Sequence, residues 1–289
     1  MIYLFLSIAC STFILIVFRM FKRFHVDTFQ AIVFNYVVAC SVGFLLYGDE
    51  WKSDFLQPNS WMVFAFIVGV LFISLFLIMA KSAQENGIGV TSVTVKMSLA
   101  IPVLMAIFLY QEAVYFSKIA GVIGALIGVF LLTYQKATAQ SSSTKAKAIF
   151  LIVLFVGSGL LDTLLNFVEK RVLSELTPAL FSAIGFGIAG TIGLLVLGFK
   201  VLFKRERVVF KNVLAGIALG IPNFFSIYFL IMAIRFTPTD DSITYALNNV
   251  GIVIASFVVG VLVFKESLSK RKLIGGIVAI LSLFLLTYF

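Results

Sequence analysis

Two charged side chains lie inside otherwise apolar stretches, and they are the residues of this sequence best placed to do chemistry. Lys96 lies in the stretch 90–110, and Asp162 lies in the stretch 148–168. A charge within a bilayer costs at least about 2.5–3.5 kcal/mol, so the charges that persist there usually face a cavity or a partner. Lys96 predicts a cation that holds a substrate carboxylate or phosphate, or else a snorkelling side chain. Asp162 predicts a proton or cation carrier, or else a structural aspartate packed against a neighbouring helix.

Neutral polar residues extend this candidate site. Ser158, Asp162, Asn166 and Glu169 have the spacing of one helix face, and Ser11 lies on the corresponding face of the first apolar stretch. The other candidates are polar residues inside apolar stretches, namely Asn35, Asn223, Tyr245, Asn248 and Asn249. A single Asn in such a place more often joins helices than binds a ligand, but together these residues predict a polar cavity.

The two charges are not expected to form a direct ion pair. With straight helices, Lys96 and Asp162 each lie about 9 Å from opposite faces of a core about 30 Å thick, so their depths differ by about 12 Å. A helix break near Pro102 would alter that estimate.

The composition requires a lipid environment for these elements. The chain is 61% hydrophobic and 12% charged, and its mean hydropathy is +1.12. About 20 apolar residues cross a bilayer as a helix. Ten stretches meet that need: 2–18, 28–47, 61–80, 90–110, 117–134, 148–168, 178–199, 211–234, 242–264 and 273–289. We therefore predict an all-α membrane protein with ten transmembrane helices.

The sequence is duplicated. Phe-Leu-Ile-Met-Ala occurs at 76–80 and 229–233, and Phe-Leu-Leu-Thr-Tyr occurs at 130–134 and 284–288. The predicted organisation is a five-helix repeat over 1–134, a polar linker over 135–147 and a second five-helix repeat over 148–289. Because five is odd, the second repeat must insert upside down, which is typical of transporters.

The loop charges predict the orientation. Loops after odd-numbered helices hold 16 Lys and Arg residues, and loops after even-numbered helices hold 5. The positive-inside rule then places the odd loops in the cytoplasm and both termini outside. The net charge of +9 is explained by these loops, so we expect no nucleic-acid partner. We expect a multi-pass protein of a bacterial inner membrane.

Two matching blocks carry a family resemblance. They read FLYQEAVYFSKIAGVIGALIGVFLLTY and LVFKESLSKRKLIGGIVAILSLFLLTY, each with a Glu at a helix end, Glu112 and Glu266. The chain resembles the EamA-type repeat of the drug/metabolite transporter superfamily, which implies two five-helix repeats and transport but no particular substrate. We interpret both Glu residues as helix-end groups that satisfy loop amides or pair with Lys118 or Lys265, rather than as ion-coupling groups.

The remaining motifs favour transport over catalysis. No Walker sequence, zinc motif, Ser/His/Asp set or dinucleotide loop is present, so we expect no enzyme activity, metal or cofactor. We expect a secondary transporter that moves a small polar or amphipathic metabolite by alternating access, coupled to protons through Asp162. The alternatives are a flippase for lipid-linked headgroups and a non-transporting assembly or sensor subunit. Glycines in the stretches 117–134 and 178–199 predict close helix packing, or else the face of a homodimer.

Overall fold

The chain is α-helical throughout the part that the structure describes. This computed structural model describes residues 1–50, 60–110, 115–133, 142–172, 177–236, 241–266 and 269–288, and no strand occurs among them. The elements are α1 (Ile2–Arg23), α2 (Thr28–Tyr47), the 3₁₀ turn η1 (Gly48–Glu50), α3 (Ser60–Glu85), α4 (Ile88–Met97), α5 (Ala100–Tyr110), α6 (Phe116–Thr133), α7 (Ser142–Arg171), α8 (Pro178–Lys204), α9 (Phe210–Phe236), α10 (Asp241–Leu262) and α11 (Lys270–Tyr288).

The helices have the length and apolarity of membrane spans. Within the described part of the chain, seven helical segments are long and apolar enough to cross a membrane. One of these segments combines α4 with the start of α5. The chain therefore has the character of a multi-pass integral membrane protein. Each predicted stretch falls on helix, but 90–110 is divided between α4 and α5.

Local capping chemistry sets several helix ends. Asp27 accepts a hydrogen bond from the backbone N–H of Gln30 at 2.7 Å and so begins α2. Thr177 caps α8, whose first residue is Pro178, and α8 ends at Arg205 in the left-handed conformation with φ 53°. α7 begins at Ser142, inside the segment 135–147 that the sequence predicts as a linker.

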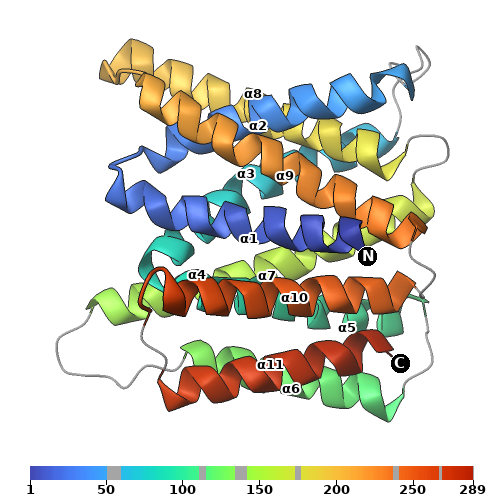
Figure 1. Cartoon of the computed structure of the whole chain (residues 1–289). Helices are drawn as coiled ribbons and strands as arrows, with labels where there is room; N and C mark the ends of the chain where they lie inside the picture. Colours follow the sequence, from blue (N-terminus) through green and yellow to red (C-terminus); the bar gives the residue numbers. More distant parts are fainter. Residues whose placement is uncertain are drawn as a thin grey trace.

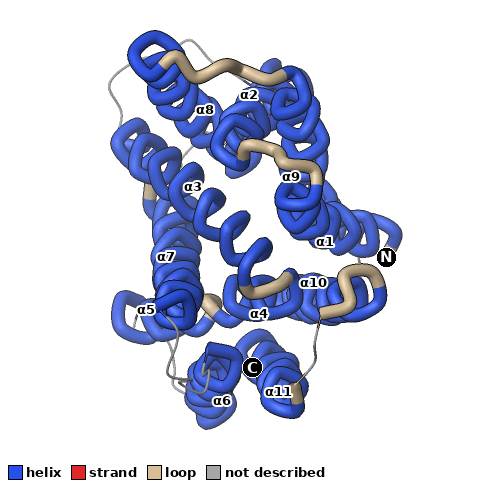
Figure 2. The backbone as a smooth tube through the Cα atoms, turned by 90° about the vertical axis from the view of Figure 1, so that its left-hand side faces the viewer, coloured by secondary structure: helices blue, strands red, loops and turns tan. Residues whose placement is uncertain are grey.

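The helices lie side by side, with both chain termini at one end of the bundle (Figure 1). At the opposite end α1, α3, α8 and α10 finish and α2, α4, α9 and α11 begin. We call this the basic end, because it carries Lys22, Arg23, Lys204, Arg205, Arg207, Lys211, Lys265, Lys270, Arg271 and Lys272. Viewed from that end, α6 and α11 form a pair at the edge of the bundle, next to α4 and α10 (Figure 2).

Helices from the two sequence halves pack against each other. α2 packs on α8 and α9, α1 on α9 and α10, and α3 on α7 and α8. α4 packs on α10 and on α7, and α6 packs on α11. Each half therefore depends on the other for its packing.

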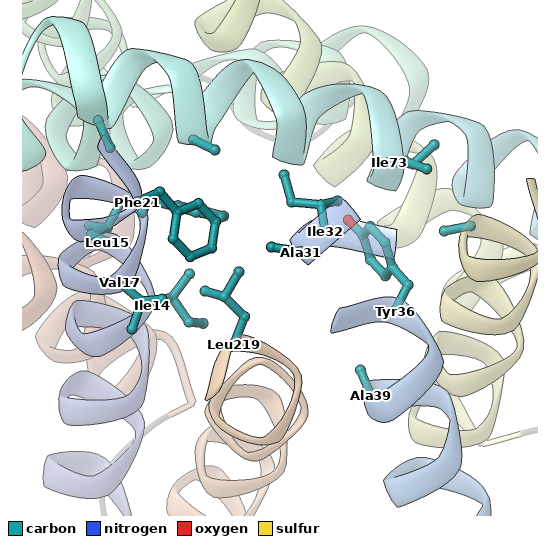
Figure 3. Close-up of a cluster of buried hydrophobic side chains, with 14 of the residues drawn as sticks. Ile14, Leu15, Val17, Phe21, Ala31, Ile32, Tyr36, Ala39, Ile73 and Leu219 are labelled. Carbon is teal, nitrogen blue, oxygen red and sulfur yellow. The ribbon is translucent and has the colours of Figure 1, made fainter. Parts of the chain in front are cut away.

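Among the described residues, the largest buried cluster lies between α1, α2, α3, α8 and α9, with Ile88 of α4 at its edge (Figure 3). The Phe18 and Phe76 rings meet edge to face at 4.9 Å between centroids, and Tyr36 donates to the carbonyl of Phe72 at 2.7 Å. Because lipid is as apolar as these side chains, close packing and such hydrogen bonds hold the helices together, more than exclusion of water.

Glycines permit the closest approaches. A Cβ on Gly121 of α6 would lie 2.8 Å from Cγ of Leu286 in α11. A Cβ on Gly193 of α8 would lie 2.7 Å from Cγ2 of Val33 in α2. These contacts confirm the predicted packing role of the glycines within the chain, and the homodimer stays a prediction.

Candidate functional site

The helix that carries Lys96 is interrupted shortly beyond it. α4 ends just before Ser98, whose hydroxyl donates to the carbonyl of Val95 at 2.6 Å. Pro102 has no N–H with which to bond the carbonyl four residues earlier, so the helix of α4 cannot continue regularly into α5. The sequence predicts one straight helix over 90–110, and the interruption corrects that prediction.

α4 packs on α7, the helix that carries Asp162. Among the described residues no direct ion pair joins Lys96 to Asp162, but the two charges lie close enough to influence each other, and Ser98 lies close to the carboxylate. Both charged side chains are half-buried. The structure therefore agrees with the prediction that the two charges form no direct ion pair, although the helix that carries Lys96 is interrupted and not straight. A half-buried pair of opposite charges can bind a charged ligand or move a proton, since each charge stabilises the other.

Hydroxyl groups surround the buried part of α4. Thr91 and Thr94 are fully buried, and each donates to its own helix backbone, to Gly87 O at 2.8 Å and Val90 O at 2.9 Å. Ser92 accepts a hydrogen bond from Ser256 of α10 at 2.6 Å. The polar end of α4 is thus packed inside the bundle.

A second polar cluster joins α1, α2 and α9. Asn223 Nδ2 donates to Asn35 Oδ1 at 3.3 Å, and Ser7 donates to the carbonyl of Ser226 at 2.8 Å. Asn35 is fully buried, and its Nδ2 has no hydrogen-bond partner. The structure thus brings Asn35 and Asn223 together as a buried amide pair between the two halves.

The other predicted residues are more scattered. Asn248 and Asn249 are buried in α10, and Oδ1 of Asn248 has no hydrogen-bond partner. Ser11 is half-buried. Asn166 is exposed and donates to the backbone carbonyl of Asp162 at 2.9 Å, so its amide bonds within its own helix. The side chain of Tyr245 lies outside the described residues, as do the side chain of Glu169 and the whole of Glu112.

Sequence reasoning missed Thr12. This residue is 5% exposed, and its Oγ1 has no hydrogen-bond partner. A lone Thr in an apolar helix has no distinguishing pattern, and only its burial between packed helices identifies it.

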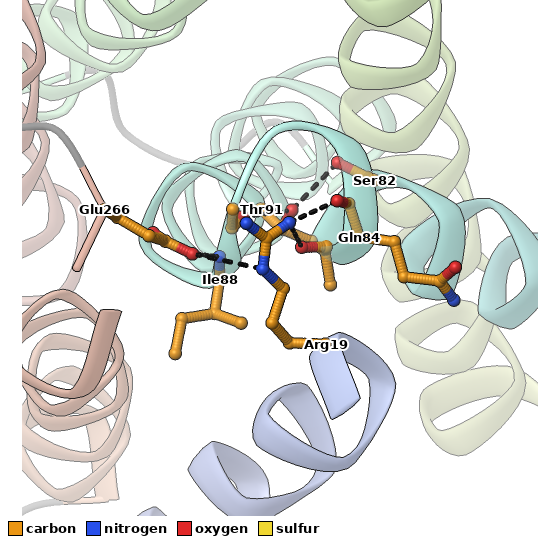
Figure 4. A network of polar contacts seen from close by, with 8 residues as sticks. Arg19, Ser82, Gln84, Ile88, Thr91 and Glu266 are labelled. Carbon is orange, nitrogen blue, oxygen red and sulfur yellow. Dashed lines mark hydrogen bonds and ion pairs between the residues drawn. The ribbon is translucent and has the colours of Figure 1, made fainter. Parts of the chain in front are cut away.

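Sequence reasoning also missed a junction at the basic end, made by Arg19, Glu266 and the start of α4 (Figure 4). Arg19 lies 3.9 Å from a carboxylate oxygen of Glu266 and donates to the carbonyls of Ala83, at 3.2 Å, and Gln84. Glu266 also accepts from the backbone N–H of Ile88 at 3.0 Å. We call these contacts the basic-end junction. They tie α1, α3, α4 and the end of α10 together.

Two glycines make room for the Glu266 carboxylate. A Cβ on Gly87 would lie 2.5 Å from its Oε2, and a Cβ on Gly260 would lie 2.7 Å from the same atom. The carboxylate thereby reaches the N-terminus of α4, where backbone N–H groups favour a negative charge. The predicted role of Glu266 in satisfying loop amides is confirmed, but its cation is Arg19 and not Lys265.

The structure also has an aromatic-lined pocket between α2, α8 and α9. Its enclosed room is only about that of one water molecule. Its lining is mainly apolar, namely Tyr47, Ala179, Ser182, Phe186, Phe224, Ile227, Tyr228 and Ile231. None of the predicted polar site residues lines it, although Phe224 follows Asn223 directly in α9. It lies away from the basic end, near the end of α2 and the start of α8.

Comparisons with known proteins support the fold and name no activity. No family model matches the chain. A Haemophilus influenzae protein described only as uncharacterized is 29% identical over 286 residues, which are 98% of this chain and 96% of that protein. A crystal structure with 16% sequence identity matches with a TM-score of 0.58, covering 98% of this chain and 96% of the other. The similarity to a solved structure shows that the whole chain adopts a known fold.

Proposed function

We propose that the chain is a secondary transporter of the EamA type in a bacterial inner membrane. It consists of two inverted five-helix repeats and moves a small polar or amphipathic metabolite by alternating access, coupled to protons. The observation that carries the proposal is the presence of two opposite charges, Lys96 and Asp162, inside the bundle beside an interrupted helix. Discontinuous helices and charges inside a membrane are features of substrate and ion pathways.

The packing supports the inverted repeat. If α7 corresponds to α1, α8 to α2 and α9 to α3, a two-fold axis in the membrane plane relates each helix contact to a second one. The contact of α1 with α9 then corresponds to that of α7 with α3, and the contact of α2 with α9 corresponds to that of α8 with α3. α2 with α8, α4 with α10 and α6 with α11 are pairs related to themselves. All of these contacts are present.

Several contacts depart from the two-fold, and one of these departures supports alternating access. α1 and α3 pack together, joined through Arg19, Ala83 and Gln84 at the basic end. Their counterparts α7 and α9 have no comparable contact in the part of the chain that the structure describes. A transporter that is closed at one end and open at the other is expected to have this asymmetry. In alternating access the two repeats exchange conformations, so the contact between α1 and α3 would be replaced by one between α7 and α9 when the other end closes.

Unpartnered polar atoms favour a transporter over a static assembly. Thr12 Oγ1, Asn35 Nδ2 and Asn248 Oδ1 are buried without hydrogen-bond partners, on α1, α2 and α10. A buried polar group without a hydrogen-bond partner costs about 1–3 kcal/mol of stability. Three such groups would therefore destabilise an interface that is permanently dry. Water or a polar substrate between the repeats would satisfy these atoms.

In this proposal Asp162 carries the proton and Lys96 responds to it. Protonation of Asp162 removes the negative charge that faces Lys96, and the ammonium can then pair with an anionic group of the substrate. Release of the proton restores the Lys96–Asp162 interaction and favours release of the substrate. In this way one pair of side chains couples the movement of protons to the movement of the substrate.

The experiment begins with purified protein and a thermal-shift screen of amino acids, nucleosides, sugars and drugs across pH. Compounds that stabilise the protein are then tested for uptake into proteoliposomes with and without a pH gradient. We expect Asp162→Asn to remove the dependence of uptake on the gradient, and Asp49→Asn, an exposed carboxylate in η1, to keep it. The proposal of proton coupling fails if Asp162→Asn responds to the gradient as the wild type does. Transport itself is contradicted if no stabilising compound is taken up or exchanged.

A further inference from the structure

We propose that the basic end carries a binding surface for the headgroups of anionic phospholipids. The connections between α1 and α2 and between α8 and α9 form this surface together. We call it the basic platform, and its cationic members are Lys22, Arg23, Lys204, Arg205, Arg207 and Lys211. Both connections lie at the same end of the bundle in Figures 1 and 2.

A buried polar clamp holds the two connections in one arrangement. Gln30 and Asn212 are 2% and 3% exposed, and Asn212 Nδ2 donates to Gln30 Oε1 at 2.8 Å. Gln30 Nε2 donates to the carbonyl of Arg207 at 3.0 Å, and the N–H of Val209 donates back to Gln30 Oε1 at 3.3 Å. The N–H of Asp27 donates to Asn212 Oδ1 at 3.1 Å. The two connections that carry the cations are therefore held in a fixed arrangement relative to each other.

The acidic groups of the platform are already engaged. Glu206 forms an ion pair with Lys200 at 3.7 Å. Asp27 accepts from the backbone N–H of Gln30 and caps α2, where the helix dipole stabilises its charge. Lys204, Arg205 and Arg207 are exposed, so the platform presents a net positive surface. The charge predicts an anionic partner.

Exposed apolar side chains beside the cations identify that partner as a lipid. On α8, Phe199 is 55% exposed, Leu202 is 76% exposed and Phe203 is 72% exposed, and Phe210 at the start of α9 is 73% exposed. α8 has 27 residues and is about 40 Å long, whereas the hydrocarbon core is about 30 Å thick. Its last turns thus reach the level of the headgroups, where aromatic and cationic side chains together favour anionic lipid. A soluble polyanion would use the charges and leave the apolar side chains in water.

The test compares lipids and two charge-matched variants of the full chain in detergent. Phosphatidylglycerol or phosphatidylcholine is titrated in mixed micelles, and the melting temperature is followed. Lys204→Gln, Arg205→Asn and Arg207→Gln are combined in the platform variant, with Asn at 205 because it tolerates the left-handed backbone. The control combines Lys270→Gln, Arg271→Gln and Lys272→Gln, which removes the same charge from the same end of the bundle, at the start of α11.

We expect phosphatidylglycerol to raise the melting temperature more than phosphatidylcholine does. The platform variant should need at least about tenfold more phosphatidylglycerol for half of the effect, since each cation near an anionic surface contributes about 1 kcal/mol, or about fivefold in affinity. The control should titrate like the wild type. Equal stabilisation by both lipids, equal losses in both variants, or full stabilisation by soluble glycerophosphoglycerol would each overturn the proposal. The melting temperature in phosphatidylcholine shows whether each variant is folded.

Discussion

At the scale of single residues, the Glu266 carboxylate is positioned by backbone shape as well as by charge. Gly87 has φ +95°, a conformation that L side chains rarely adopt, and a Cβ there would lie 2.5 Å from the carboxylate. The N–H of Ile88 and the guanidinium of Arg19 then have the carboxylate within reach. The basic-end junction therefore depends on a residue that makes no side-chain contact of its own.

We expect Gly87→Ala to lower the free energy of unfolding by about 1–3 kcal/mol, because the backbone conformation is strained for Ala and the new Cβ meets Glu266. Gly198→Ala is the matched control, because a Cβ there would meet nothing within 4 Å beyond the local backbone of its own helix. It should be neutral or stabilising by about 0.4–1 kcal/mol. Denaturant unfolding in detergent measures both. Equal effects of the two substitutions would contradict this reading of Gly87.

At the scale of helices, the interruption between α4 and α5 is the feature that determines the candidate site. Pro102 is the third residue of α5, where its missing N–H is tolerated, but it prevents regular continuation of α4.

We expect Pro102→Ala to extend the helix through Ser98 and to change the position of Lys96 relative to Asp162. Proteoliposome uptake of a compound found in the screen should fall at least about tenfold, which corresponds to about 1.4 kcal/mol. The melting temperature should stay level or rise, since an N–H donor is restored. Pro178→Ala, at the first position of α8 and away from the site, is the control and should keep uptake. Unchanged uptake in Pro102→Ala would show that the interruption does not matter for transport.

Helix positions were predictable where local chemistry sets them, and contacts across the bundle were not. The stretch 28–47 coincides with α2 because Asp27 caps its start and Gly48 follows its end. α3, α8 and α9 extend beyond the predicted apolar stretches, because helix can continue through charged residues that hydropathy excludes. The meeting of Arg19 with Glu266 depends on how α1, α3 and α10 pack, and no periodicity in the sequence records that.

At the scale of the whole molecule, the proposed transport cycle gives the basic-end junction the role of closing one end of the bundle. It joins α1 to α3 and, through Glu266, to the start of α4 and the end of α10. No comparable contact joins α7 to α9 in the described residues. Thr12 is 5% exposed, and in the proposed cycle we expect it to lie behind this junction when approached from the basic end.

We expect Arg19→Gln to open this end more often. A loss of about 1 kcal/mol of closure energy raises the open population about fivefold. The reporter is Thr12→Cys in a chain with Cys10→Ala and Cys40→Ala, labelled in oriented membranes with a maleimide that cannot cross the bilayer. Labelling from the basic end should become several-fold faster with Arg19→Gln. Lys81→Gln is the control, because Lys81 lies over the ring of Phe150 and not in the junction.

If the positive-inside rule holds for this chain, the faster labelling occurs from the cytoplasmic side, because the basic end then faces the cytoplasm. Labelling that is unchanged by Arg19→Gln, or that increases only from the opposite side, would contradict closure by Arg19 and Glu266.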